Sequence, residues 1–113
     1  MTTCLFCAIA AGDVPAEVVR ETADTVAFRD IAPQAPVHVL VVTRRHFADA
    51  GALAADPGLA GRFLADVAEV AAVEGIAELG YRIVLNTGVD GGQTVPHVHA
   101  HILGGRGLTW PPG

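Results

Sequence analysis

Residues 37–43 read Val37-His38-Val39-Leu40-Val41-Val42-Thr43 and carry the strongest strand pattern in the chain. A nearly continuous run of β-branched and apolar residues is typical of a strand that is covered on both faces of a sheet. The sequence therefore predicts a central strand at these residues. The segment just before it, residues 31–36, contains two prolines that cannot pair regularly in a sheet, so we expect a rigid loop there.

Shorter strands are predicted on both sides of the central strand. Residues 18–21 and 25–29 are rich in β-forming residues and are separated by a short turn-forming segment, which predicts a hairpin. Residues 81–86 and 96–103 are predicted as the last two strands, with a glycine-rich loop between them.

Two helices are predicted. Residues 56–57 are Asp-Pro, a typical helix cap and first helical residue, and the apolar residues after them recur at helical spacing up to Gly80. These apolar residues are Leu59, Phe63, Val67, Val70 and Ala71. A short helical run is expected at residues 4–10, with Thr2 or Thr3 as its cap. The order of elements indicates an α+β fold: an antiparallel sheet with one long helix and a short N-terminal helix.

The composition describes a small acidic protein. Its 113 residues are 51% hydrophobic and 17% charged, so we expect a single domain spanning residues 1–113. No run approaches the roughly 20 uninterrupted apolar residues of a membrane span, so no membrane partner is expected. A net charge of −5 without a basic patch argues against a nucleic-acid polymer as partner. The N-terminus lacks a secretory pattern and two cysteines are too few for a disulfide framework, so a cytoplasmic protein is expected.

Three of the five histidines, His97, His99 and His101, lie within five residues. On a strand these side chains point to the same face, because alternate residues share a face. Imidazole titrates near neutral pH, so such a row can supply a nucleophile, a proton donor and a contact for phosphate. The same spacing also suits a metal site or purely structural histidines, and spacing alone leaves these three interpretations open.

The glycine-rich loop, residues 88–94, directly precedes the histidine row and reads Gly-Val-Asp-Gly-Gly-Gln-Thr. Its backbone N–H groups could surround an anion, and Gln93 and Thr94 add side-chain donors. The alternative is an ordinary turn between two strands. Loop and histidines together favour a small phosphate pocket, in which an acidic protein binds one phosphate group through dipoles and imidazoles.

These stretches together resemble the histidine triad family. The resemblance is carried by residues 30–38 (Asp-Ile-Ala-Pro-Gln-Ala-Pro-Val-His), Asn86, residues 91–94 (Gly-Gly-Gln-Thr) and residues 97–101 (His-Val-His-Ala-His). Residues 104–106 (Gly-Gly-Arg) and 110–113 (Trp-Pro-Pro-Gly) are similar to the nucleoside phosphoramidase branch of that family. The resemblance extends from residue 4 to residue 113 and implies the antiparallel α+β fold of the family.

The resemblance implies a hydrolase in which His99 attacks the α-phosphorus of a purine nucleotide and becomes transiently nucleotidylated, after which water releases the nucleoside monophosphate. It implies that the backbone carbonyl of His97 supports His99, that His38 stands beside the row, and that catalysis needs no cofactor. Further groups implied at or beside the phosphate are Asn86, Gly92, Gln93, Thr94, Val95 and His101.

The nucleoside pocket implied by the resemblance has Phe28 and Ile31 on either side of the base and Asp30 at the ribose hydroxyls. Two positions depart from the family pattern, because Thr94 stands where serine is common and Pro96 where tyrosine is common. The first departure keeps a hydroxyl. The second removes a backbone donor and a ring, so we expect altered contacts near the leaving group.

Cys4 and Cys7 form a Cys-x-x-Cys pair, which can supply two thiolates at the spacing of a zinc site. By resemblance to some family members, His46 and His97 complete a closed site of four ligands, and such a zinc would be structural because no ligand position remains open. The alternative is a pair of small buried thiols.

A homodimer is also expected. The resemblance implies that residues 104–113, including Trp110, reach the nucleotide pocket of the partner, and an exposed tryptophan beside a core of limited size points the same way. Two other functions remain open. One is a dinucleoside polyphosphate hydrolase of the same family, which the tail disfavours, and the other is a zinc-stabilised nucleotide-binding or interaction protein with incidental turnover.

Overall fold

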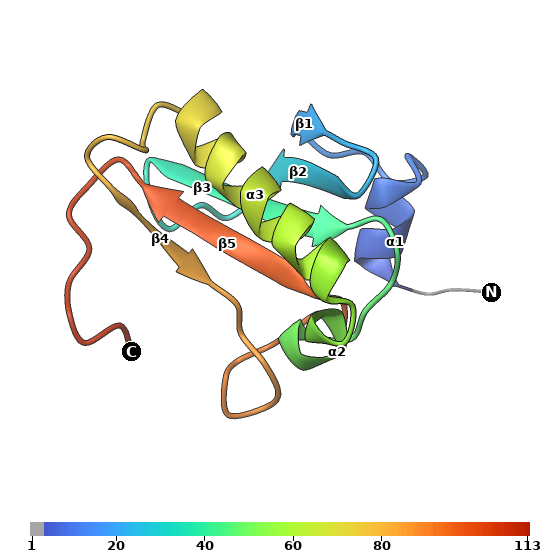
Figure 1. Cartoon of the computed structure of the whole chain (residues 1–113). Coiled ribbons are helices and arrows are strands. Elements are labelled where there is room, and N and C mark those ends of the chain that lie inside the picture. The colour runs from blue at the N-terminus through green and yellow to red at the C-terminus, as the bar shows by residue number, and fades with distance from the viewer. Residues whose placement is uncertain (1–3) are drawn as a thin grey trace.

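The computed structural model describes residues 4–113, and its central feature is a five-stranded antiparallel sheet in the order β1-β2-β3-β5-β4 (Figure 1). The strands are β1 (Val18–Glu21), β2 (Thr25–Arg29), β3 (Val37–Thr43), β4 (Tyr81–Val84) and β5 (His99–Gly104). The helices are α1 (Leu5–Ala10), α2 (Ala50–Ala54) and α3 (Pro57–Val73). β3 lies between β2 and β5 in the middle of the sheet, so the predicted central strand and α+β fold are confirmed.

The first three strands have the predicted bounds, whereas the last two are shorter than predicted. β4 ends at Val84, and β5 begins only at His99 because the residues just before it form a bend. Pro96 lies in that bend and has no N–H to donate to a neighbouring strand, which accounts for the late start of β5.

The long helix α3 begins where predicted but ends earlier. Asp56 accepts from the Leu59 amide at 3.2 Å and so caps the first turn. Gly75 has a φ of 78°, a left-handed conformation that stops the helix after Val73. The predicted continuation toward Gly80 is therefore wrong.

Two short helices precede α3. α1 has the predicted position, and Cys4 caps it, because its Sγ accepts from the Cys7 amide at 3.4 Å. The predicted caps, Thr2 and Thr3, lie outside the described residues. α2 is not predicted from the sequence; Asp49 caps it by accepting from the Ala52 amide at 2.9 Å. Within residues 4–113, no helix combines the length and apolar character needed to cross a membrane.

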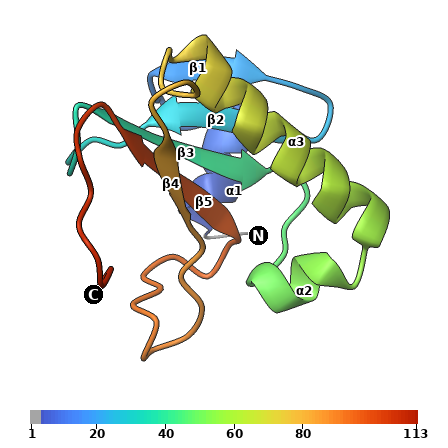
Figure 2. The same cartoon turned by 60° about the vertical axis from the view of Figure 1, so that its left-hand side comes forward.

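The two faces of the sheet are covered differently (Figures 1 and 2). α3 crosses one face and closes the larger apolar core, which includes Val39, Val41, Ala100 and Ile102 from the two central strands. α1 covers part of the opposite face, where Phe6 packs with a smaller core. That smaller core contains the alternate strand residues Val26, Phe28, Leu40 and Val42. We call these two sides the α3 face and the α1 face.

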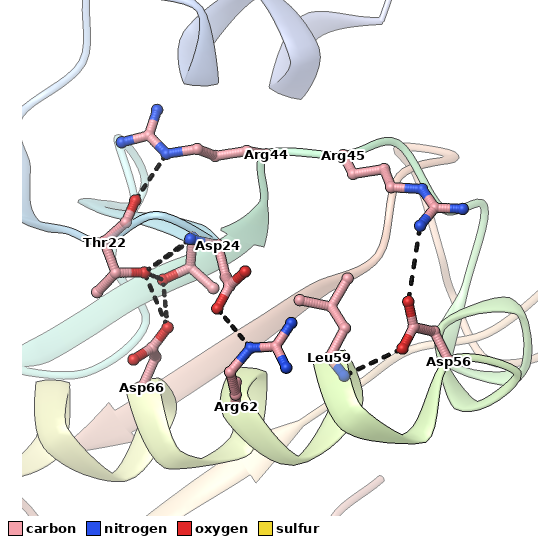
Figure 3. Close-up of polar contacts among 9 residues, drawn as sticks. Thr22, Asp24, Arg44, Arg45, Asp56, Leu59, Arg62 and Asp66 are labelled. Atoms are coloured by element: carbon pink, nitrogen blue, oxygen red, sulfur yellow. Dashed lines mark hydrogen bonds and ion pairs between the residues drawn. The ribbon is translucent and has the colours of Figure 1, made fainter.

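Polar contacts fasten the β1–β2 hairpin to α3 (Figure 3). The Thr22 and Thr25 hydroxyls donate to the same carboxylate oxygen of Asp66, at 3.0 and 2.9 Å. Beside them, the Nε of Arg62 donates to Asp24 at 2.8 Å. These contacts hold the hairpin against the helix, so side chains on the α1 face project from a firmly supported sheet.

Candidate functional site

His99 and His101 lie on β5 and project from the α1 face. Opposite them on β3 stand Val42 and Leu40, which both belong to the small core of that face. The two imidazole rings have their centroids 5.1 Å apart. His97 lies in the bend before β5, so the three histidines do not form one row along a strand as the sequence predicts.

The surroundings of His99 fix the position of its proton. Its Nδ1 is 2.7 Å from the backbone carbonyl of His97, and because a carbonyl can only accept, Nδ1 carries the proton. Nε2 therefore keeps a free lone pair. The ring is buried and meets the edge of Phe6 at a centroid distance of 4.9 Å. An imidazole that is oriented through Nδ1 in this way presents Nε2 as the ring nitrogen that can act as a nucleophile.

A chain of hydrogen bonds sets the protons on His38 and His101. The Gln34 amide donates to His38 Nδ1 at 3.0 Å, so neutral His38 carries its proton on Nε2. That Nε2 donates to His101 Nδ1 at 2.9 Å and also faces Asp30 at 3.5 Å. Burial, followed by the nearby His99 and His38, lowers the pKa of His101 to about 4, so this ring is neutral at pH 7. His101 is left with an Nε2–H group that can donate to an anionic ligand.

The histidines of β5 border a cavity of about 430 Å³ on the α1 face. Its lining is mostly apolar, as expected for a pocket that holds a flat organic ring. Phe28, Asp30 and Ile31, which the resemblance assigns to the nucleoside, line this cavity, and so do Thr94 and Val95. The structure therefore brings these five predicted residues together with His99 and His101.

One wall of the cavity comes from α1, which the sequence analysis does not assign to the site. Leu5, Phe6 and Ile9 line this wall, and the Phe6 ring also meets Phe28 edge to face at 5.7 Å. The available signal was their spacing, which places three apolar side chains on one side of a short helix. Phe6 therefore joins the small core to the cavity.

Four of the predicted nucleotide-binding residues do not line the cavity in the described chain: Asn86, Gly92, Gln93 and Trp110. The Gln93 side-chain amide donates to the backbone carbonyls of Ala48 and Val95, at 2.8 and 3.0 Å. The backbone amides of Gly92 and Gln93 donate to carbonyls within the same loop. The loop thus closes on itself and supports Thr94 and Val95 at the edge of the cavity. Trp110 is 82% exposed.

A second group of side chains meets beside Phe6 and consists of Cys4, Cys7, His46 and His97. One ligand atom from each lies within 4.8 Å of the other three, and the sulfur–nitrogen and nitrogen–nitrogen contacts run from 3.2 to 3.4 Å. A tetrahedral zinc ion, with Zn–N near 2.0 Å and Zn–S near 2.3 Å, separates its ligand atoms by about 3.3 to 3.8 Å. The four residues therefore fit a zinc ion in number, type and spacing.

The hydrogen bonding of His97 prepares it as a ligand. Its Nε2 donates to the Thr43 carbonyl at 2.8 Å, so the lone pair is on Nδ1 and faces both sulfurs and His46. Burial lowers the pKa of His97, which keeps the ring neutral. Two sulfurs and two imidazoles make a closed set, which is typical of a structural site.

Comparisons with known proteins find relatives that match this chain over nearly its whole length. A family model described as HIT domain matches residues 11–108. An uncharacterized HIT-like protein of Synechococcus elongatus is 50% identical over 110 residues, covering 96% of each chain. The adenylylsulfatase HINT1 of Arabidopsis thaliana is 42% identical over 112 residues, covering 96% of this chain and 76% of that protein. The crystal structure of a HIT family hydrolase from Legionella pneumophila matches with a TM-score of 0.94 and 47% identity, covering 98% of this chain and 100% of that one.

Proposed function

Because this chain belongs to the histidine triad (HIT) family, we propose that it is a hydrolase of purine nucleoside phosphoramidates or related nucleotidyl substrates. The observation that carries the proposal is the geometry of His99, a buried imidazole whose Nδ1–H donates to the His97 carbonyl. Its Nε2 lone pair borders a cavity of the size and apolar character that a nucleoside needs.

The reaction would proceed in two displacements at the α-phosphorus. His99 Nε2 attacks phosphorus, the bond from phosphorus to the leaving nitrogen breaks, and the amine departs with the electron pair and takes up a proton. Water then attacks the same phosphorus and releases a proton, which balances the one taken up by the amine, the bond to Nε2 breaks, and the nucleoside monophosphate leaves. The Nε2–H of His101 supports both steps by donating to a phosphoryl oxygen, since positioning and electrostatics dominate such reactions.

We propose that the nucleoside lies in the cavity with its base against the apolar wall. Phe28 and Ile31 would contact the base, and Phe6 would contribute from α1. Asp30 would accept hydrogen bonds from the ribose hydroxyls. In support of this, one Asp30 oxygen accepts from the Ala32 amide at 2.8 Å, which orients the carboxylate at the rim of the cavity.

A relative and the C-terminal tail bear on the leaving group of the substrate. The Arabidopsis relative is named an adenylylsulfatase, which supports nucleotides activated by sulfate as substrates beside phosphoramidates. The tail at residues 104–113 resembles the phosphoramidase branch and therefore favours an amine over the second nucleotide of a dinucleoside polyphosphate.

The activity test compares wild type with His99→Asn on an adenosine phosphoramidate. We expect release of AMP by wild type and its loss in the variant. If wild type releases no AMP, or the variant releases it equally fast, the enzyme assignment fails and a binding or interaction protein remains.

We propose that Cys4, Cys7, His46 and His97 hold a structural zinc ion, which would tie the start of α1 to the bend before β5 and to the segment after β3. The cytoplasm is the proposed compartment, because its reducing conditions keep both thiols available. Metal analysis of the purified protein should give close to one zinc per chain, and a Cys4→Ser/Cys7→Ser variant should give none. A value near zero in wild type would refute the zinc site.

We also propose a homodimer formed through the β4 edge and α3. β4 is an edge strand, and beside it lies a groove of about 190 Å³ that includes the exposed side chains of Leu64, Ile83 and Leu85. An open strand edge next to apolar side chains is a typical surface for a second copy. In the dimer, the tail with Trp110 would reach the partner's cavity. Light scattering should give twice the mass of one chain for wild type. The Ile83→Glu variant should give the mass of a single chain.

A further inference from the structure

We infer that Arg106 is a positioning residue for the histidines of the site, which it reaches through the loop at residues 31–36. This inference rests on the proposed function, because it assigns Arg106 to the same reaction. Residues 104–106 belong to the family resemblance, but the resemblance gives Arg106 no role of its own, and Arg106 does not line the cavity because it lies after β5 in the C-terminal tail.

Two neighbouring residues of the C-terminal tail, Gly105 and Arg106, pack against the loop at residues 31–36. The Arg106 guanidinium donates to the Gln34 carbonyl and to the Gly107 carbonyl, each at 2.9 Å. Gly105 has a φ of 90°, and a Cβ atom at this position would lie only 2.9 Å from Pro36. Glycine is therefore required for this close approach, which brings Arg106 within reach of Gln34.

Gln34 connects this contact to the site. Its carbonyl accepts from Arg106 while its backbone amide donates to His38 Nδ1 at 3.0 Å, so the two hydrogen bonds hold one residue from both sides. The Gln34 side chain is also tied back to the Ala32 carbonyl at 2.9 Å. Prolines at residues 33 and 36 stiffen the loop, so a displacement at the Gln34 carbonyl is transmitted to its amide.

The Gln34 amide, together with the Asp30 carboxylate that His38 Nε2 faces at 3.5 Å, favours the His38 tautomer with its proton on Nε2. As long as His38 Nδ1 accepts from this amide, the His38 proton is on Nε2 and is donated to His101 Nδ1. His101 then keeps its own proton on Nε2, where it can meet a phosphoryl oxygen, which only accepts. Loss of the amide contact would allow His38 to move its proton to Nδ1. His101 would then carry its own proton on Nδ1, and its Nε2 could no longer donate to a phosphoryl oxygen. Arg106 thus acts on the reaction through Gln34, His38 and His101.

Arg82 offers a matched control. Its guanidinium donates to the Thr109 carbonyl at 2.7 Å, so it also fastens the tail through one arginine-to-carbonyl hydrogen bond, but it does not touch the loop. Arg106→Ala and Arg82→Ala remove the same charge and the same kind of contact. We expect Arg106→Ala to lower kcat on an adenosine phosphoramidate by about 3- to 10-fold with KM nearly unchanged. Arg82→Ala leaves the Gln34 contact in place and should lower kcat less than Arg106→Ala does, and Arg106→Lys should recover part of the loss because it can still donate to Gln34.

Nitrogen NMR of the imidazole rings tests the tautomers directly. In wild type and Arg82→Ala, Nδ1 of His38 and of His101 should be unprotonated, whereas Arg106→Ala should show a mixture at both residues. The inference is overturned if Arg106→Ala keeps the wild-type tautomers, or if both alanine variants lose kcat equally. If wild type does not turn over the phosphoramidate at all, the proposed function fails instead, and the NMR comparison still decides whether Arg106 governs the tautomers.

Discussion

The two faces of the sheet are built from alternate residues of the same strands, yet they differ in nearly every property. On β5, Ala100 and Ile102 point to the α3 face and are completely buried among apolar side chains. His99 and His101 point to the α1 face, beside a cavity and a smaller core. The α3 face thus supplies most of the stability, and the α1 face holds the groups that can do chemistry. A strand can serve both purposes because its side chains alternate.

The largest expected effect on activity comes from comparing two substitutions on β5, one on each face of the sheet. His99→Asn should lower kcat by at least about 1,000-fold because it removes the nucleophile, and it should leave the fold intact. Ile102→Val, three residues away on the α3 face, should cost about 1 kcal/mol of unfolding free energy and leave kcat within about twofold. Steady-state kinetics and urea denaturation of both variants measure this. A large loss of activity in Ile102→Val would mean that the faces are not independent.

Phe6 is the residue at which the division between a stabilising face and a functional face should fail, because it belongs to both a core and the cavity. It is 5% exposed, fills the core of the α1 face and lines the cavity, so Phe6→Ala should affect both stability and binding. We expect a loss of about 3 kcal/mol in unfolding free energy, from the cavity left behind, together with a severalfold higher KM. The control is Leu5→Ala, since Leu5 also lines the cavity but is 48% exposed and should cost little stability. An unchanged KM in Phe6→Ala would remove α1 from the site.

The α1 face should also give the protein a dependence on pH. His101 has a pKa of about 4 in the folded chain and about 6.5 when unfolded, with His99, His38 and Asp30 as its titratable neighbours. Between these values the unfolded chain binds the extra proton, so the stability that neutral His101 contributes is complete above pH 6.5 and is lost as the pH falls toward 4. Urea denaturation at pH 7, 5.5 and 4.5 gives the free energy of unfolding. This free energy should decline less with falling pH in His101→Gln than in wild type. Parallel declines would contradict the low pKa.

The smallest expected effect concerns the exposed contacts on the α3 face. Arg62 pairs with Asp24 at 2.8 Å, but the Arg62 side chain is 61% exposed. Water screens such a pair, so Arg62→Ala should shift the melting temperature by no more than about 2 °C and leave the kinetics unchanged. A larger shift, measured by calorimetry, would mean that the β1–β2 hairpin depends on this pair more than on the contact of the buried Thr25 with Asp66.

The sequence predicted the elements whose patterns are local. Strands β1 to β3 follow from β-branched runs bounded by turns, and the start of α3 follows from Asp56 and its proline. The errors also have local causes. Pro96 delays β5, the backbone of Gly75 ends α3 early, and α2 is too short and alanine-rich to show a periodic pattern.

The site could be predicted only in part, because it depends on contacts between distant residues. The resemblance anticipated Phe28, Asp30 and Ile31 beside the histidines, and the structure brings them to one cavity. The resemblance did not reveal that the Gln93 side-chain amide donates to two backbone carbonyls, or that Phe6 forms a wall of the cavity. Proton positions depend on individual backbone groups, such as the amide of Gln34, and no residue pattern encodes those.

α1 is only six residues long, yet it stands between two sites. Cys4 and Cys7 bind it to the proposed zinc, and Phe6 and Ile9 form a wall of the proposed nucleoside pocket. A metal ion bound by Cys4 and Cys7 would order α1, and with it the wall of the nucleoside pocket. In the same way, a nucleotide packed against Phe6 and Ile9 would hold the two cysteine sulfurs in position. Thermodynamic reciprocity then requires that each ligand raise the affinity of the other by the same factor. A titration of zinc with and without AMP would thus report on the nucleotide pocket without any turnover.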